Sequence, residues 1–126
     1  MSYTINENKL ILDDEFNGTL DDFIFPDFLE SITFGEYFNK NIDKVKFPDS
    51  LQHITFESSV QGLDNVKFPD SLQSITFGDD FNQNIDEVKF PDSLQSITFG
   101  YKFNQNIDDV KLPDFLQNLT FEGYFN

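Results

Sequence analysis

The chain has 126 residues, with 23 acidic residues against eight lysines, no arginine and no cysteine, and its formal net charge is −15. This charge disfavours binding to nucleic acid and anionic membranes, because both are recognised by clusters of Lys and Arg. The 17 phenylalanines are incompatible with an ordinary disordered acidic tail. The missing cysteines exclude a disulfide framework, a thiolate metal site and a Cys nucleophile.

Residues 1–9 are polar, and we expect them to form an N-terminal cap before the repeats of residues 10–126. They lack the apolar core of a secretory signal peptide. No apolar run approaches the roughly 20 residues that a membrane-spanning helix needs. We therefore expect a single domain over residues 1–126 that is intracellular and cytoplasmic.

The rest of the chain repeats with a period of 22 residues, shortened once to 21. Such a period, with apolar residues at fixed places, is typical of a solenoid in which each coil packs on the next. About five and a half units fill the chain after the cap. The prolines mark the period: Pro26, Pro48, Pro69, Pro91 and Pro113.

Each unit contains a Ser-Ile-Thr-Phe stretch, or a close variant, in which polar and apolar residues alternate. This alternation predicts a parallel strand with Ile and Phe inward and Thr outward, stacked about 4.8 Å apart. The outward column is Thr33, Thr55, Thr76, Thr98 and Thr120. A second alternation, Val88-Lys89-Phe90 and its equivalents, predicts a shorter parallel strand on the opposite side of the coil. No stretch has helical spacing, so the predicted fold is a β-rich solenoid with little or no helix.

Five apolar columns are predicted to fill the interior, and three of them consist mainly of phenylalanine. Buried rings remove about 150–250 Å² each from water, which can stabilise a chain that has no disulfides. The phenylalanine columns are Phe34, Phe56, Phe77, Phe99 and Phe121; Phe16, Phe38, Val60, Phe81, Phe103 and Phe125; and Phe25, Phe47, Phe68, Phe90 and Leu112. The others are Leu29, Leu51, Leu72, Leu94 and Leu116, and Leu20, Ile42, Leu63, Ile85 and Ile107.

Three coils carry the motif Phe-Gly-x-x-Phe-Asn, at residues 34–39, 77–82 and 99–104. Gln-Asn-Ile follows at 83–85 and 105–107, and Pro-x-Ser-Leu recurs at 48–51, 69–72 and 91–94. With these motifs the chain resembles the FNIP repeat family, a variant of the leucine-rich repeat. The resemblance implies a right-handed, leucine-rich-repeat-like solenoid with a role in protein interaction, and it implies no catalytic residue. The third coil departs from the motif, with Val60 and Gln61 in place of Phe and Asn.

An asparagine column accompanies the last phenylalanine of the motif. We interpret it as a structural ladder, in which each amide bonds to backbone groups of neighbouring corners, rather than as a ligand or metal site. Its members are Asn17, Asn39, Asn82, Asn104 and Asn126.

Two aspartate columns run along the repeat, with a lysine column between them. Stacked carboxylates offer hard oxygen ligands, so Ca²⁺-dependent binding is a remote alternative function. The lysines lie three residues from each aspartate and favour solvated charge ladders instead. The columns are Asp21, Asp43, Asp64, Asp86 and Asp108; Asp27, Asp49, Asp70, Asp92 and Asp114; and Lys46, Lys67, Lys89 and Lys111.

His53 is the single histidine, and it occupies an outward strand column that otherwise holds Ser31, Ser74, Ser96 and Asn118. A catalytic triad needs one activated Ser and one orienting acid, whereas these serines repeat as surface residues. We therefore interpret His53 as a surface residue, and the sequence predicts neither an enzyme nor a cofactor.

The two x positions of the motif differ in every coil, although the core columns barely change. Tyr, which is favoured at interfaces, occurs there three times in a protein that otherwise uses Phe. These positions either recognise a partner or vary freely as corner residues. The candidates are Tyr37, Asp79, Asp80, Tyr101, Lys102 and Tyr124, with His53 on the outward strand face.

The leading functional hypothesis is a non-enzymatic module that binds a protein with a basic or neutral surface. The alternative is self-assembly, including a homodimer, through an uncapped C-terminal edge. The candidate residues for that edge are Phe121, Tyr124 and Phe125.

Overall fold

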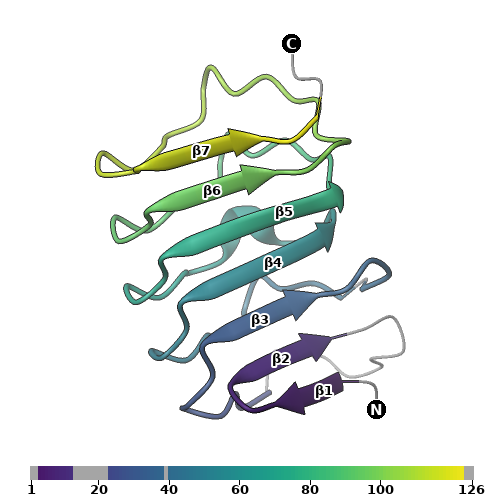
Figure 1. Cartoon of the computed structure of the whole chain (residues 1–126), viewed down its shortest axis with the longest axis vertical. Helices are drawn as coiled ribbons and strands as arrows, with labels where there is room; N and C mark the ends of the chain where they lie inside the picture. Colours follow the sequence, from purple (N-terminus) through teal and green to yellow (C-terminus); the bar gives the residue numbers. More distant parts are fainter. Residues whose placement is uncertain (1–2, 13–22, 39, 124–126) are drawn as a thin grey trace.

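The computed structural model describes residues 3–12, 23–38 and 40–123 and consists of one sheet whose strands follow chain order (Figure 1). Strands β2 to β7 are parallel, and each belongs to a new coil. This arrangement is the predicted β-solenoid. The strands are β1 (Tyr3–Asn6), β2 (Lys9–Leu12), β3 (Ser31–Phe34), β4 (His53–Ser58), β5 (Ser74–Asp80), β6 (Ser96–Phe99) and β7 (Asn118–Phe121).

The predicted cap segment contains β1, which pairs antiparallel with β2. Glu7 lies in the turn between them with a left-handed φ of 58°. The hairpin supplies backbone partners to the edge of β2, which would otherwise be an open template for another strand. The carbonyl of Asn8 also accepts hydrogen bonds from the amides of Glu30 and Ser31, at 2.8 and 3.2 Å, which ties the cap to the following coil.

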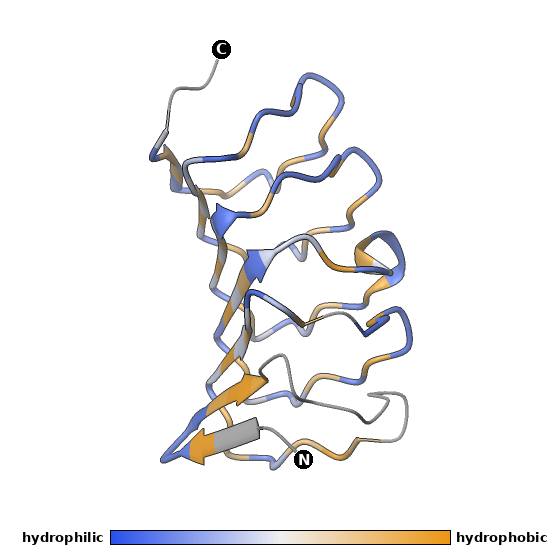
Figure 2. Cartoon of the chain, turned by 90° about the vertical axis from the view of Figure 1, so that its right-hand side faces the viewer, coloured by the Kyte–Doolittle hydropathy of each residue, from blue (hydrophilic) through white to orange (hydrophobic). Residues whose placement is uncertain are grey.

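The strand register stacks identical residues on one another, as the period predicts. Phe34 pairs with Phe56, Phe56 with Phe77 and Phe77 with Phe99. Their ring centroids lie 5.2, 5.8 and 5.1 Å apart, and the rings are nearly parallel. These four rings are no more than 1% exposed, and hydrophobic residues recur along every coil (Figure 2).

The back of the coil differs from the prediction, because no second strand forms there within the described residues. Its only parallel contacts are isolated bridges, Asn41 with Gln61 and Lys46 with Lys67. The backbone turns tightly instead: the amide of Val45 bonds to the carbonyl of Ile42 at 3.2 Å, and Val88 to Ile85 at 3.1 Å. These turns use amides that a ladder would need. The buried valines (Val45, Val66 and Val88) also form an inward column that the sequence analysis did not count.

The third coil is shortened at its corner, where Gly62 adopts a left-handed φ of 87°. A single 3₁₀ turn, η1 (Leu63–Asn65), follows it. A Cβ on Gly62 would lie 2.2 Å from Asn41 Oδ1 and 2.6 Å from the amide nitrogen of Asp43. Only glycine fits this site, because both the backbone conformation and the contact with the preceding coil exclude a side chain.

The last described coil is packed less completely than the central ones. Leu119 in β7 is 36% exposed, whereas its neighbour Ile97 in β6 is fully buried. Partly buried apolar residues of the same coil are Ile107, Val110, Leu112, Leu116 and Phe121. None of the helical turns in the described part of the chain is long and apolar enough to cross a bilayer.

Candidate functional site

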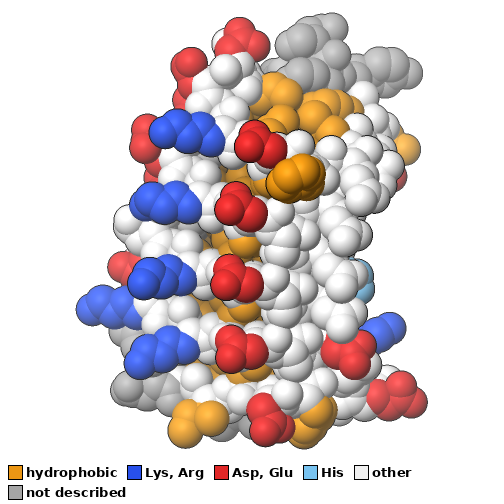
Figure 3. Space-filling model, turned by 90° about the vertical axis from the view of Figure 1, so that its left-hand side faces the viewer, with side chains coloured by type: hydrophobic (Ala, Val, Ile, Leu, Met, Phe, Trp, Pro, Cys, Tyr) orange, Lys and Arg blue, Asp and Glu red, His pale blue; other side chains and the backbone are white. Residues whose placement is uncertain are grey.

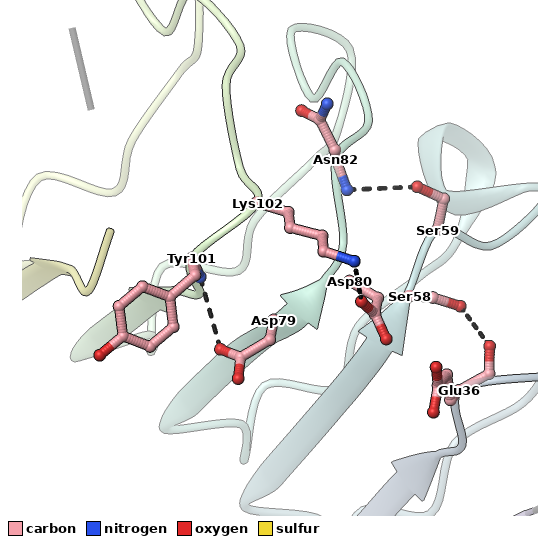
Figure 4. A network of polar contacts seen from close by, with 8 residues as sticks. All are labelled: Glu36, Ser58, Ser59, Asp79, Asp80, Asn82, Tyr101 and Lys102. Carbon is pink, nitrogen blue, oxygen red and sulfur yellow. Dashed lines mark hydrogen bonds and ion pairs between the residues drawn. The ribbon is translucent and has the colours of Figure 1, made fainter. Parts of the chain in front are cut away.

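The positions that vary between coils lie at or just after the ends of the strands, and we call them the variable edge: Glu36, Tyr37, Ser58, Ser59, Asp79, Asp80, Tyr101 and Lys102. Figure 4 shows all of these residues except Tyr37. Strands β4 and β5 are longer than their neighbours and extend into this edge. Ser58 at the end of β4 pairs with Asp80 at the end of β5, after a register shift that follows Phe56. Because of the shift, Asp80 pairs with Ser58, although it lies three residues after Phe77 and Ser58 lies two residues after Phe56.

The glycine of the motif allows adjacent coils to approach closely below this edge. A Cβ on Gly100 would lie 2.5 Å from the carbonyl carbon of Gly78 and 2.7 Å from the Cα of Asp79. The Phe-Gly pair is therefore structural: the ring fills the core and the missing side chain leaves room for the neighbouring backbone.

Polar contacts link the edge from coil to coil (Figure 4). Lys102 Nζ lies 2.8 Å from Asp80 Oδ1 and forms an ion pair. The hydroxyl of Ser58 donates to the carbonyl of Glu36 at 2.7 Å. The amide of Tyr101 donates to Asp79 Oδ1 at 3.4 Å. The amide of Asn82 donates to Ser59 Oγ at 3.4 Å, so polar contacts link four successive coils.

Asp80 lies at the centre of the electrostatics of this network. Its pKa is lowered, first by the hydrogen bond from Lys102 and then by a hydrogen bond with Glu36. The pKa of Glu36 is raised, because Glu36 shares that hydrogen bond and faces the negative charge of Asp80. The pKa of Lys102 is raised by the hydrogen bond to Asp80 and by its charge. Sequence reasoning missed Glu36 as a member of this site; the shortened interval between Phe56 and Phe77 was the signal that could have indicated it.

The two described tyrosines of the edge project into solvent. The side chains of Tyr37 and Tyr101 are 66% and 63% exposed, in a molecule whose other rings mostly fill the core. Tyr124 and Phe125, together with Asn17, Asn39 and Asn126, lie outside the described residues. Phe121 stacks on Phe99 with a centroid distance of 5.1 Å and is partly buried.

The asparagine column makes one contact between described coils. Asn82 Oδ1 accepts hydrogen bonds from the amide of Asn104 and from Gln105 Nε2, both at 2.9 Å. A second asparagine set, which the sequence analysis did not single out, closes the next corner. Each of its Oδ1 atoms accepts the amide of the aspartate two residues later at 2.8 Å: Asn41 with Asp43, Asn84 with Asp86, and Asn106 with Asp108.

His53 lies at the start of β4, and its Nδ1 is 2.6 Å from the hydroxyl of Ser74 on β5. Both side chains are on the outward face of the sheet. Within the described residues, no carboxylate hydrogen-bonds to His53, so the third member of a triad is missing there.

The acidic and lysine columns run side by side along the face that precedes the strands (Figure 3). Lys102 with Asp80 forms the only ion pair within 4.0 Å in the described ranges, so these columns do not neutralise each other through close contacts. Those ranges also contain no group of three or more His, Cys, Asp or Glu residues that could hold a metal ion. The calcium alternative gains no support from them.

Comparison with known proteins connects this geometry to a family. The solved structure of CroV588, described as a novel circular LRR protein, matches with a TM-score of 0.52 and 25% identity. The match covers 100% of this chain but only 32% of that protein, so this chain spans about a third of its length. No curated protein matches significantly. A model of the FNIP repeat matches residues 16–59 and 61–102, which is more than half of the chain. On this evidence the chain belongs to the FNIP repeat family, with a fold that is a variant of the leucine-rich repeat.

Proposed function

We propose that this protein is a non-enzymatic protein-interaction module and that its variable edge is the recognition surface. One observation supports this most strongly. The coils repeat the same core, yet the edge differs in each coil and exposes Tyr37 and Tyr101 by about two-thirds. An aromatic ring with a polar tip can pack against a partner while its hydroxyl remains hydrogen-bonded.

The charge distribution defines the class of partner. The net charge is −15, and Lys102, the described cation of the edge, is held by Asp80. Asp79 and Glu36 add further negative charge there. The partner therefore presents a basic or neutral surface, and added salt slows its association by screening the attraction.

The test compares the wild-type chain with Y37S/Y101S in affinity capture from the source cell, followed by titration of the purified captured protein. Both tyrosines are exposed, so their replacement should leave the unfolding transition unchanged, while affinity should fall by roughly tenfold or more. The matched control is N118S, which puts into β7 the residue that β3, β5 and β6 carry at the same position. Equal affinity of the wild type and Y37S/Y101S for every captured protein would refute the edge as the recognition surface.

Self-association is a second candidate, and the partial burial of the last described coil favours it. Leu119 and its neighbours leave apolar surface open to a second copy of the chain. Sedimentation velocity tests this candidate: L119K should lower the mass of any oligomer, while T120K, on the outward side of β7, should not. A strict monomer at high micromolar concentration would contradict it.

A further inference from the structure

A groove lies at the opposite end of the strands from the variable edge. It follows the turns that precede β3 to β6 and has a volume of about 590 Å³. Each turn has the sequence Pro-Asp-x-Leu, and the amide of its Leu bonds to the carbonyl of its Pro at 3.1–3.3 Å in residues 26–94. The x residue is Phe28, Ser50, Ser71, Ser93 and Phe115 in successive coils.

The three serines form a fixed floor for this groove. Ser50 Oγ donates to the carbonyl of Leu29 at 2.5 Å, and Ser71 Oγ donates to that of Leu51 at 2.5 Å. Ser93 Oγ donates to the carbonyl of Leu72 at 2.7 Å. Each hydroxyl thus joins its turn to the preceding coil. The small side chains leave a trough, and its shape is set by the frame of the solenoid rather than by mobile groups.

The two large residues of this column lie at its ends and are not needed for packing. Phe28 is 55% exposed and Phe115 is 79% exposed, and they are the only described phenylalanines whose side chains are exposed rather than buried or half-buried. Three coils form the same turn with Ser in this position. Phe28 lines one end of the groove, and Phe115 belongs to the coil that follows Ser93, one coil beyond the residues that line the other end.

The walls of the groove carry negative charge. Glu30, Asp49 and Asp70 line it, together with three glutamines, and no lysine does. None of these acids has an ion-pair partner within the described part of the chain. The acidic column of this face is visible in Figure 3. A positively charged group placed in the groove would relieve repulsion between carboxylates that successive coils bring close together.

We propose that this groove binds an extended basic segment of another protein, with an apolar side chain against Phe28 and another against Phe115. Four steps between coils of about 4.8 Å place the two rings about 19 Å apart. Six steps along an extended peptide, at about 3.3 Å each, cover about 20 Å, and alternate side chains face the same way. A seven-residue segment therefore presents apolar residues at its ends and Lys or Arg at its third and fifth positions to the carboxylates.

The negative charge of the groove also disfavours other classes of occupant. A second copy of this chain carries a net charge of −15 and no described basic segment of this pattern, so it is repelled. Phosphate groups of nucleic acids or lipids are repelled for the same reason. The groove is distinct from the variable edge, and its occupancy does not depend on the function proposed for that edge.

The experiment titrates the ¹⁵N-labelled full chain with the peptide Leu-Ser-Lys-Ser-Lys-Ser-Leu and follows amide chemical shifts. We expect saturable shifts confined to residues 28–30, 49–52, 70–73, 92–95 and 115. F28S/F115S should weaken binding by roughly tenfold, because it removes both apolar contacts. This variant carries the residue that the central coils already have at this position, so it should fold normally.

Charge is tested separately, with variants of equal net charge. D49N/D70N should weaken binding by roughly fivefold, and D64N/D108N, whose aspartates belong to the other acidic column, should not. The peptide Leu-Ser-Glu-Ser-Glu-Ser-Leu should not bind. Absence of shifts up to about 5 mM peptide, shifts located elsewhere, or equal affinity of F28S/F115S and wild type would each overturn the proposal. Binding of the basic peptide by Y37S/Y101S with wild-type affinity would support a groove independent of the edge.

Discussion

Asp80 lies between a cation, Lys102, and a second acid, Glu36, and these two neighbours affect its carboxyl group differently. Lys102 stabilises the ionised carboxylate, whereas Glu36 shares a hydrogen bond with it and is itself made harder to ionise. The folded state therefore favours ionised Asp80 and protonated Glu36. The contribution of Asp80 to stability is present at neutral pH and is lost as the pH falls through its lowered pKa. That of Glu36 is present in acid and is lost as the pH rises through its raised pKa.

Replacing Lys102 by Gln should raise the pKa of both carboxyl groups, because Lys102 lowers the pKa of each. The measurement is a titration followed by ¹³C NMR of the side-chain carboxyl carbons. K111Q is the control, since Lys111 forms no ion pair with a described residue. An unchanged Asp80 titration in K102Q would show that the ion pair does not persist in solution.

At the scale of elements, the repeat predicts the strands and their stacking, but it does not predict the backbone conformation of the corners between them. The period alone places Phe34, Phe56 and Phe77 in one stack, because identical residues in a solenoid face the same neighbours. The prediction of a second strand at the back of the coil was wrong. The hydropathy alternation around Val88 does not reveal that local turns use the backbone amides there. The proximity of Glu36 to Asp80 was not predicted, although the 21-residue interval between Phe56 and Phe77 signals an irregular coil there. It depends on the register shift after Phe56, and the shortened interval does not show which residues that shift brings together.

Gly62 offers a test of how the shortened coil is accommodated. G62A should lower the free energy of unfolding by about 2–4 kcal/mol, because a left-handed backbone is strained for alanine and its Cβ meets Asn41. Urea denaturation measures the change. Q61A, at the exposed neighbouring position, should stay within about 0.5 kcal/mol of wild type. Similar values for both variants would mean that the corner rearranges to accept a side chain.

Over the whole molecule, negative charge dominates, and ten of the 23 acidic residues lie in the two repeated aspartate columns. Net charge of −15 keeps copies of the chain apart at low ionic strength. Salt shortens the range of this repulsion, from about 10 Å at 0.1 M to about 3 Å at 1 M. The apolar surface around Leu119 remains the same size while the repulsion that opposes its burial declines.

If copies associate through the last described coil, the mean mass in sedimentation should therefore rise with added salt. The rise should be absent in L119K and retained in T120K, because Thr120 faces outward on the same strand. Binding of a basic partner should show the opposite salt dependence and weaken. A mass that is independent of salt would exclude repulsion between copies as the factor that limits self-association.

The antiparallel pairing of β1 makes the β1 side of the sheet different from the side of β7, where another coil could pair in parallel. Strands β2 to β7 pair in parallel with one another, whereas β1 pairs antiparallel with β2. Insertion of a unit between existing coils or after β7 preserves every pairing, whereas insertion before the hairpin would require a new cap. Because each coil contacts only its neighbours, such insertions lengthen the display surface without redesigning the core. The hairpin thus covers one edge of β2, and the parallel pairing of the following coils would let their number change without a change in the core.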